Sequence, residues 1–77
     1  MPNDESNWGT HLRSRRRELE FTQAQLADSV GVSRQTINYI EQGTYCPSTK
    51  LGLQIAHALG TTMDALFFLK EDEEEMV

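Results

Sequence analysis

The chain has few of the residues that form covalent cross-links or bind metals. Among its 77 residues there is one cysteine, Cys46, which excludes an intrachain disulfide and a cysteine-based zinc site. His11 and His57 are far apart in the sequence, with no ligand-type residues clustered around either, so we expect both to face solvent. We therefore expect no metal and no cofactor.

Long apolar runs and catalytic motifs are missing as well. No stretch of about 18 apolar residues occurs and no charged-then-apolar leader opens the chain, so we expect no membrane span, no secretory signal and a cytoplasmic location. A paired nucleophile and base and a glycine-rich phosphate loop are also absent, which argues against an enzyme. From this length we expect one small domain and no second domain large enough to bind a typical small-molecule ligand.

Basic residues are not in excess. The formal net charge is -5 at pH 7, which alone argues against a nucleic-acid partner, because phosphate contacts need positive charge. Seven acidic residues lie at the two ends of the chain, however, and residues 9–70 carry a net charge of +2. We therefore expect a flexible arm at residues 1–6, one compact domain at residues 7–69 and an acidic tail at residues 70–77. Such a tail is typical of a disordered, solubilising end; alternatively, it mimics phosphates and covers the arginines of the domain.

Residues 22–43 have the pattern of two short helices joined by a turn. Thr22 followed by Gln25 predicts a capping box at the start of the first helix, and Ser33 is a good N-cap for the second. Gly31, between them, can adopt a positive φ without strain, so the chain can turn sharply there. This spacing is typical of a helix-turn-helix.

The second of these helices has two different faces. At 100° per residue, Ile37 and Ile40 lie on its inward side. The opposite side spans an arc of about 140° and has no aliphatic residue. Its members are Arg34, Gln35, Asn38, Tyr39 and Gln42. The ends of Arg, Gln and Asn side chains can pair with two atoms of a base edge at once, Arg with guanine and the amides with adenine. We therefore expect this face to enter the major groove of double-stranded DNA, where Asn38 reads a base or contacts a phosphate.

The whole chain predicts an all-α fold, a compact bundle of five helices. We expect helices at about residues 8–19, 23–30, 34–42, 49–59 and 63–67, with Ser48 capping the fourth and Thr61 or Thr62 the fifth. The apolar residues at helical spacing predict one shared core. They are Leu12, Leu19, Leu26, Val30, Ile37, Ile40, Leu51, Ile55, Leu59, Met63, Leu66 and Phe67.

One charged pair is expected inside this core. Arg16 lies between Leu12 and Leu19 on the apolar stripe of the first helix, and Glu41 borders the inward side of the third. A buried arginine needs a paired acceptor, so we predict a salt bridge between Arg16 and Glu41. The alternative is an Arg16 side chain that is solvated like its neighbours.

The residues in and after the predicted helix-turn-helix resemble those of a known family. The segment Gly43–Ser48, then Leu51, Ile55 and Ala56, then Ala58–Gly60 and finally Asp64–Phe67 follow in the order of that family's later loop, fourth helix and fifth helix. From about residue 7 to residue 69 the chain resembles the Cro and lambda-repressor type of helix-turn-helix regulators. The resemblance implies a lambda-repressor-like DNA-binding domain and the same pairing of Arg16 with Glu41.

The resemblance also implies contacts with DNA. Gln23, at the start of the second helix, is expected to hold a phosphate, helped by the positive end of the helix dipole. Arg34, Gln35 and Tyr39 match base-reading positions, and Gln42, Gly43 and Thr44 match positions that touch the DNA backbone. Three arginines of the first helix are further candidates for backbone contacts, or else form a solvated helix face. They are Arg13, Arg15 and Arg17.

Two residues depart from the family pattern. Arg15 stands where leucine is usual, and Glu20 stands where a glycine normally ends the first helix. Glu20 at positive φ would be modestly strained. Alternatively, the first helix ends differently in this chain.

These observations predict a sequence-specific transcriptional regulator, a repressor or an activator with repression favoured, that acts as a homodimer on an inverted repeat. One module touches only a few base pairs, and specific binding usually needs two half-sites about 34 Å apart. The candidates for the dimer contact are Trp8, Phe67, Phe68 and Leu69. The apolar run at residues 66–69 either continues as a strand that pairs with a partner or covers the core of the monomer.

A second interpretation is a protein-interaction role. In it the chain is an antitoxin-like or adaptor module whose C-terminal segment binds another protein, and its DNA binding serves only autoregulation. A stoichiometric protein partner would favour this interpretation.

Overall fold

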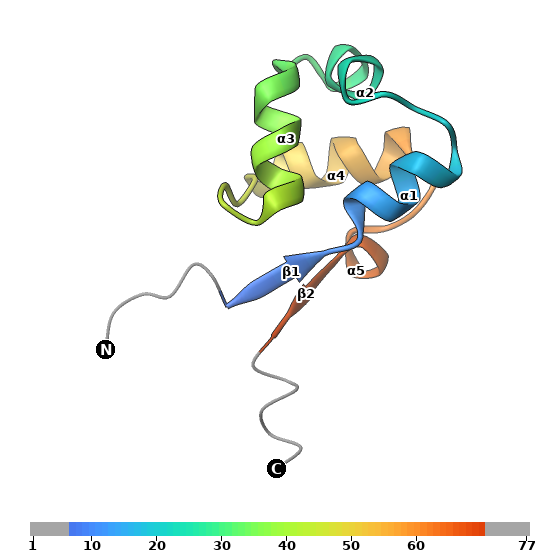
Figure 1. Ribbon diagram of the computed structural model, residues 1–77. Coiled ribbons are helices and arrows are strands. Elements are labelled where there is room, and N and C mark those ends of the chain that lie inside the picture. The colour runs from blue at the N-terminus through green and yellow to red at the C-terminus, as the bar shows by residue number, and fades with distance from the viewer. Residues whose placement is uncertain (1–6, 71–77) are drawn as a thin grey trace.

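The structure, a computed structural model, describes residues 7–70, and within them it has five helices and one small sheet (Figure 1). The elements follow in the order β1 (Trp8–Thr10), α1 (Leu12–Glu18), α2 (Gln23–Val30), α3 (Arg34–Gln42), α4 (Thr49–Ala58), α5 (Met63–Leu66) and β2 (Phe67–Leu69). Figure 1 shows α2 and α3 at one end of the molecule and the two strands at the other. The predicted five-helix fold is confirmed, with the sheet as an addition to it.

The predicted arm at residues 1–6 and the acidic residues 71–77 lie outside the described part of the chain. Within residues 7–70, none of the helices has the length and apolar character needed to cross a membrane.

Hydroxyl side chains begin four of the described helices, as the sequence predicts. The capping residues are Thr22, Ser33, Ser48 and Thr62, and each accepts a hydrogen bond from the backbone N–H three residues later. Thr22 completes a capping box, because its own N–H donates to Gln25 Oε1 at 2.9 Å. Gly31, with φ of 76°, then ends α2 and turns the chain into α3. Local interactions therefore fix both ends of the α2–α3 unit.

One apolar core holds the helices together. Its fully buried members are Leu12, Leu26, Ile37, Ile40, Ile55, Leu59 and Leu66. Ala27 is 2% exposed, and its small side chain allows α2 and α3 to pack closely. The core prediction is wrong for Leu19, which is 43% exposed. Because α1 ends at Glu18, Leu19 lies beyond the last helical turn and leaves the apolar stripe.

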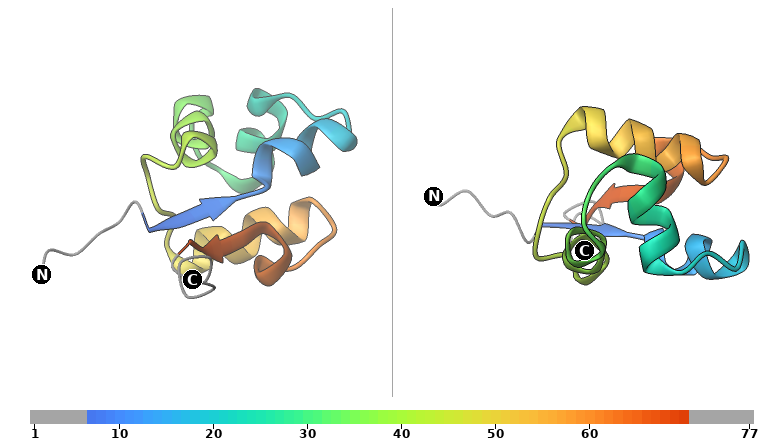
Figure 2. Two further views of the ribbon diagram at one scale, coloured as in Figure 1. Left: turned by 60° about the horizontal axis from the view of Figure 1, so that its bottom comes forward. Right: turned by 90° about the horizontal axis from the view of Figure 1, so that it is seen from above.

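The first helix begins later than predicted, because residues 8–10 form a strand. β1 lies antiparallel to β2 (Figure 2), and the register of their pairing places Gly9 opposite Phe68. A Cβ atom on Gly9 would stand 2.5 Å from the Phe68 ring, so the ring can lie over this position only because residue 9 is glycine. Of the two alternatives for the apolar run at residues 66–69, a strand does form, at Phe67–Leu69, but it pairs with residues 8–10 of the same chain.

Thr10 joins this sheet to the helices. Its hydroxyl donates to the carbonyl oxygen of Leu66 at 2.8 Å and accepts from the N–H of Leu12 at 3.1 Å. The backbone N–H of His11 also donates to Leu66 O, at 2.8 Å. The start of α1 is thus fixed to the end of α5, which are distant in the sequence.

Glu20 adopts the left-handed conformation, with φ of 61°. It occupies the position where the sequence resemblance predicts glycine, so the first of the two alternatives for this junction is the correct one. The backbone turns sharply here, and Phe21 N–H donates to Arg16 O at 3.1 Å. The same turn brings the carbonyl oxygen of Phe21 within 2.7 Å of Arg16 Nη1. A strained residue therefore shapes the connection between α1 and α2.

Candidate nucleic-acid interface

The exposed side of α3 carries the predicted reading face. Ile37 and Ile40 are fully buried, so packing against the core fixes how α3 is rotated. On the opposite side Arg34, Gln35, Tyr39 and Gln42 are exposed and Asn38 is half-buried. All five predicted polar residues thus lie on one surface of a helix whose orientation the core determines.

Two residues of this face are joined to each other. Gln35 Nε2 donates to the hydroxyl oxygen of Tyr39, one helical turn later, at 2.9 Å. The bond uses one of the two amide hydrogens of Gln35 and leaves its second hydrogen and Oε1 for a base edge. Those two groups are the donor and the acceptor that a bidentate contact with adenine requires.

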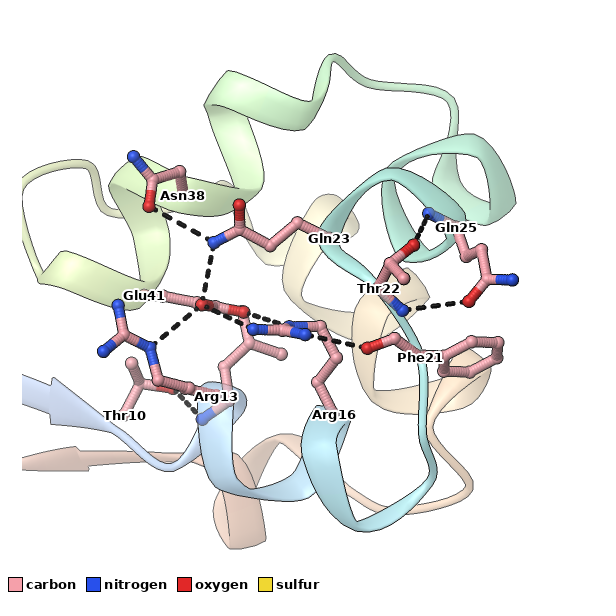
Figure 3. A network of polar contacts seen from close by, with 10 residues as sticks. Thr10, Arg13, Arg16, Phe21, Thr22, Gln23, Gln25, Asn38 and Glu41 are labelled. Atoms are coloured by element: carbon pink, nitrogen blue, oxygen red, sulfur yellow. Dashed lines mark hydrogen bonds and ion pairs between the residues drawn. The ribbon is translucent and has the colours of Figure 1, made fainter.

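Behind the reading face, Glu41 is the centre of a network of polar contacts (Figure 3). The predicted ion pair with Arg16 is present, with Arg16 Nε 2.6 Å from Oε2 and Nη2 3.2 Å from Oε1. Arg13 Nε lies 3.3 Å from the same Oε1. The Glu41 side chain has no exposed surface, whereas Arg13 is half-exposed. The network ties α1 to α3 and leaves the second arginine near solvent.

The contacts of Glu41 determine its charge. Burial raises the pKa of the carboxyl, but hydrogen bonds from Arg16 and Gln23, the charge of Arg16 and a hydrogen bond from Arg13 lower it by more. The pKa therefore lies below its ordinary value, and Glu41 is a carboxylate near neutral pH. A carboxylate only accepts hydrogen bonds, so every neighbour must turn a donor toward it.

Positive charge gathers beside this network. Arg13, Arg17, Gln23 and Arg34 line one concave surface formed by α1, the start of α2 and the start of α3. Arg16, which is paired with Glu41, lines the same hollow, so four guanidinium groups surround it and create a positive potential that suits a phosphate group. The structure thus brings together predicted residues from three separate helices.

Arg15 is not part of this surface. Its Nε donates to the carbonyl oxygen of Leu59 at 3.1 Å, and its Nη1 lies 3.4 Å from Glu18. It lines a different hollow, together with His11. The guanidinium satisfies a carbonyl at the C-terminal end of α4, where a positive charge is favourable. The structure therefore separates Arg15 from the other arginines that we expected at the DNA backbone.

The predicted backbone-contacting residues at the end of α3 follow directly from the reading face. Gly43 has φ of 80° and ends the helix after Gln42. Thr44 then turns back, and both its N–H, at 3.0 Å, and its hydroxyl, at 3.1 Å, donate to Tyr39 O. This segment is therefore held against α3 rather than extending away from it.

One relationship in the site was not predicted. Gln23 Nε2 donates to Glu41 Oε1 at 3.0 Å and to Asn38 Oδ1 at 3.2 Å, so it connects the buried carboxylate to the reading face. The three-residue spacing of Asn38 and Glu41 places them on one side of α3 and is the sequence signal that could have suggested a shared partner. That the partner is Gln23 depends on how α2 packs on α3.

The predicted dimer contacts have different environments. Trp8 is half-buried against the core, with its ring centroid 6.1 Å from that of Phe67. Phe68 lies against His11 at 4.8 Å between ring centroids. Leu69 is 53% exposed. The three aromatic residues thus have partners within the chain, and Leu69 is the member of the set that remains largely open to solvent.

Among residues 7–70 there is no group of three or more potential ligand side chains placed to hold a metal ion. Cys46 is exposed in the loop between α3 and α4.

One helix, α2, packs against a second helix, α3, that has an exposed polar face beside a basic hollow, and this arrangement defines a helix-turn-helix DNA-binding domain. Residues 12–66 match the model of the helix-turn-helix family, of the Cro and lambda-repressor type, and the chain belongs to that family. It is a DNA-binding transcriptional regulator of the helix-turn-helix class.

Several known proteins are similar to this chain. A protein of Methanothermobacter thermautotrophicus named as an HTH-type transcriptional regulator is 48% identical over 64 residues, which are 82% of this chain and 93% of the relative. The crystal structure of the clp gene regulator ClgR from Corynebacterium glutamicum has a TM-score of 0.66 and 32% identity, covering 69% of this chain and 56% of that one. Hydroxypropylphosphonic acid epoxidase from S. wedmorenis also has a TM-score of 0.66, with 31% identity, but only 29% of its chain is covered.

Proposed function

We propose that this regulator recognises its operator by placing α3 in the major groove of double-stranded DNA. The observation that carries the proposal is the division of α3 into a buried side and an exposed polar side. Arg34, Gln35, Asn38 and Tyr39 read base edges, because their planar or hydroxyl ends supply the donors and acceptors that major-groove recognition needs.

The remaining contacts position the domain on the DNA backbone. The hollow lined by Arg13, Arg17 and Arg34 receives a phosphate, and the N-terminal end of α2 at Gln23 adds its partial positive charge. At the other end of α3, the segment of Gln42, Gly43 and Thr44 meets the backbone. Arg15, which caps α4, is left out of this contact set.

Selection of bound duplexes from a random DNA pool at near-physiological salt tests this proposal. The wild-type protein should enrich one sequence, and the Arg34→Ala and Gln35→Ala variants should lose the preference at the positions they read. Gln54→Ala is a matched control, because Gln54 is an exposed glutamine on α4. No enriched sequence with the wild-type protein would contradict the proposal and favour the protein-interaction role.

We also propose that the protein acts as a homodimer on an inverted repeat, with β2 at the contact. Leu69 offers exposed apolar surface, and β2 has β1 on one edge only within the described residues. Two domains related by a twofold axis would read half-sites about 34 Å apart.

Light scattering at tens of micromolar, without and with the selected duplex, tests the dimer. Leu69→Glu should reduce the dimer fraction, whereas Leu53→Glu, at an equally exposed leucine of α4, should not. A monomer under both conditions would exclude the dimer, and a loss of dimer with Leu53→Glu alone would move the contact to α4.

The sign of regulation that we propose is repression, because a domain bound across a promoter blocks access without any further contact. A reporter gene downstream of the selected sequence should lose expression when the wild-type protein is present and recover with Arg34→Ala. An increase in expression would identify an activator. We further propose a cytoplasmic location, because a transcriptional regulator must reach the chromosome and the similar proteins are archaeal and bacterial.

A further inference from the structure

A chain of hydrogen bonds runs from the buried carboxylate of Glu41 to the reading face of α3. Glu41 Oε1 accepts from Gln23 Nε2 at 3.0 Å, and the same Nε2 donates to Asn38 Oδ1 at 3.2 Å (Figure 3). The three side chains come from α2 and α3 and meet where the two helices pack. The chain connects a charged group that DNA cannot reach with an amide on the surface that DNA would meet.

The chemistry of these groups sets the direction of every bond in the chain. Glu41 pairs with Arg16 and Arg13, so it is an acceptor only and Gln23 must turn its NH₂ group toward it. The NH₂ group of Gln23 has two hydrogens, and it donates the second one to the neighbouring side-chain atom of Asn38. That atom must be the oxygen, because a second NH₂ group could not accept it. Asn38 is therefore held with Oδ1 toward Gln23 and Nδ2 pointing away from the network, as Figure 3 shows.

We infer that Glu41, acting through Gln23, fixes the amide of Asn38 so that it offers DNA a hydrogen-bond donor. Asn38 then selects an acceptor at the position it meets: purine N7, guanine O6, thymine O4 or a phosphate oxygen. A freely rotating asparagine could turn either end outward and would discriminate poorly between donor and acceptor edges. The inference rests on the proposed reading of DNA by α3.

Gln23 has a different role here from the one the family resemblance implies. Both of its amide hydrogens are used within the protein, so the Gln23 side chain positions Asn38 and does not itself donate to DNA. If Gln23 held a phosphate through its side chain instead, replacing it would weaken binding without changing which acceptor Asn38 recognises. This difference makes the two roles separable.

The experiment uses the full-length protein and the duplex that the wild-type protein selects. A set of derivatives of that duplex each lack one acceptor: a purine N7 replaced by C–H, guanine O6 or thymine O4 removed, or one phosphate replaced by methylphosphonate. We expect one derivative to weaken wild-type binding about tenfold and to weaken Asn38→Ala binding less than about twofold. Whether that derivative is modified at a base or at a phosphate identifies the acceptor. Equal sensitivity of Asn38→Ala and wild type to every derivative would overturn the inference.

The second arm tests the role of Gln23. Gln23→Met keeps the length of the side chain but cannot donate a hydrogen bond. In this variant, the duplex derivative that weakened wild-type binding tenfold should weaken binding much less. Derivatives that remove the acceptors of Arg34 and Gln35 should weaken binding as much as they do for the wild-type protein. Gln54→Met, the same change on α4, should leave all effects intact. Asn38→Asp, which cannot donate, should bind the parent duplex no better than Asn38→Ala. Full sensitivity in a folded Gln23→Met protein would overturn the positioning role, whereas failure of the wild-type protein to select any duplex would overturn the proposed function and the inference with it.

Discussion

Arg16 and Glu41 form a bidentate ion pair that joins α1 to α3, with distances of 2.6 Å and 3.2 Å between donor nitrogens and carboxylate oxygens. The Arg16 side chain is 9% exposed and that of Glu41 is 0% exposed. The pair therefore fixes the position of α3 against α1.

Removing one member of this pair should strongly destabilise the protein. In Glu41→Ala, two guanidinium groups lose their acceptor and Arg16 is left buried, which should lower the free energy of unfolding by about 3–5 kcal/mol. Urea unfolding followed by circular dichroism measures the change. Glu18→Ala is the control, because its contact with Arg15 is exposed and its loss should cost less than about 0.5 kcal/mol. An unchanged midpoint for Glu41→Ala would show that the pair contributes nothing.

The stability of the protein should fall in acid, in part through Glu41. Its pKa is below the ordinary value of 4.5 in the folded chain and returns to that value on unfolding. Between these two values the unfolded chain binds a proton that the folded chain does not, so the stability contributed by Glu41 is complete above about pH 5 and is lost as the pH falls through the folded pKa. Urea unfolding at pH 6, 4 and 3 should show a smaller acid loss in Glu41→Gln than in wild type. Parallel profiles for the two proteins would contradict this.

The hydroxyl of Tyr39 should contribute to sequence preference without contributing to stability. Tyr39→Phe removes the acceptor of Gln35 Nε2, which is 2.9 Å away on the exposed face. We expect the base preference at the position read by Gln35 to weaken by about threefold to tenfold, with the melting temperature unchanged. Competition binding with single-base variants of the selected duplex measures the preference. Tyr45→Phe, which removes a hydroxyl from the exposed loop after α3, should preserve it; an equal loss in both variants would argue against the role of Tyr39.

Glu20→Gly should stabilise the protein. A non-glycine residue at φ of 61° is strained by about 1–2 kcal/mol, and glycine removes this strain. Glycine also loses more conformational entropy on folding, which offsets the gain by about 0.5–1 kcal/mol. The expected net gain is about 0.5–1 kcal/mol in the free energy of unfolding. Glu18→Gly, two residues earlier within α1, should instead destabilise by about 1 kcal/mol. Destabilisation by both changes would show that Glu20 is not strained.

The parts of the structure that depend on local sequence were predictable. The caps at Thr22 and Ser33, the turn at Gly31 and the two faces of α3 each follow from residues within a few positions of one another. The contact between Arg16 and Glu41 joins residues 25 positions apart, and it was predicted because each lies on the inward side of its helix and a buried arginine needs an acceptor.

The parts that were mispredicted depend on contacts between distant residues. Residues 8–10 have no local signal that favours a strand; they form one because residues 67–69 lie beside them in the folded chain. Leu19 satisfies the helical spacing but lies beyond the end of α1. The contact between Gln23 and Asn38 likewise requires the packed pair of helices, which no periodicity describes.

The pairing of β1 with β2 brings the two ends of the described chain together, and the N–H of Lys70 donates to the carbonyl oxygen of Asn7 at 3.0 Å. Both ends lie on the side of the molecule opposite α2 (Figure 1). A unit whose entry and exit points are adjacent can be inserted into, or fused to, a larger polypeptide without being opened. Similar regions make up 56% of the ClgR chain and 29% of the epoxidase chain. The short strand pair thus places both attachment points of the domain next to each other and away from α2.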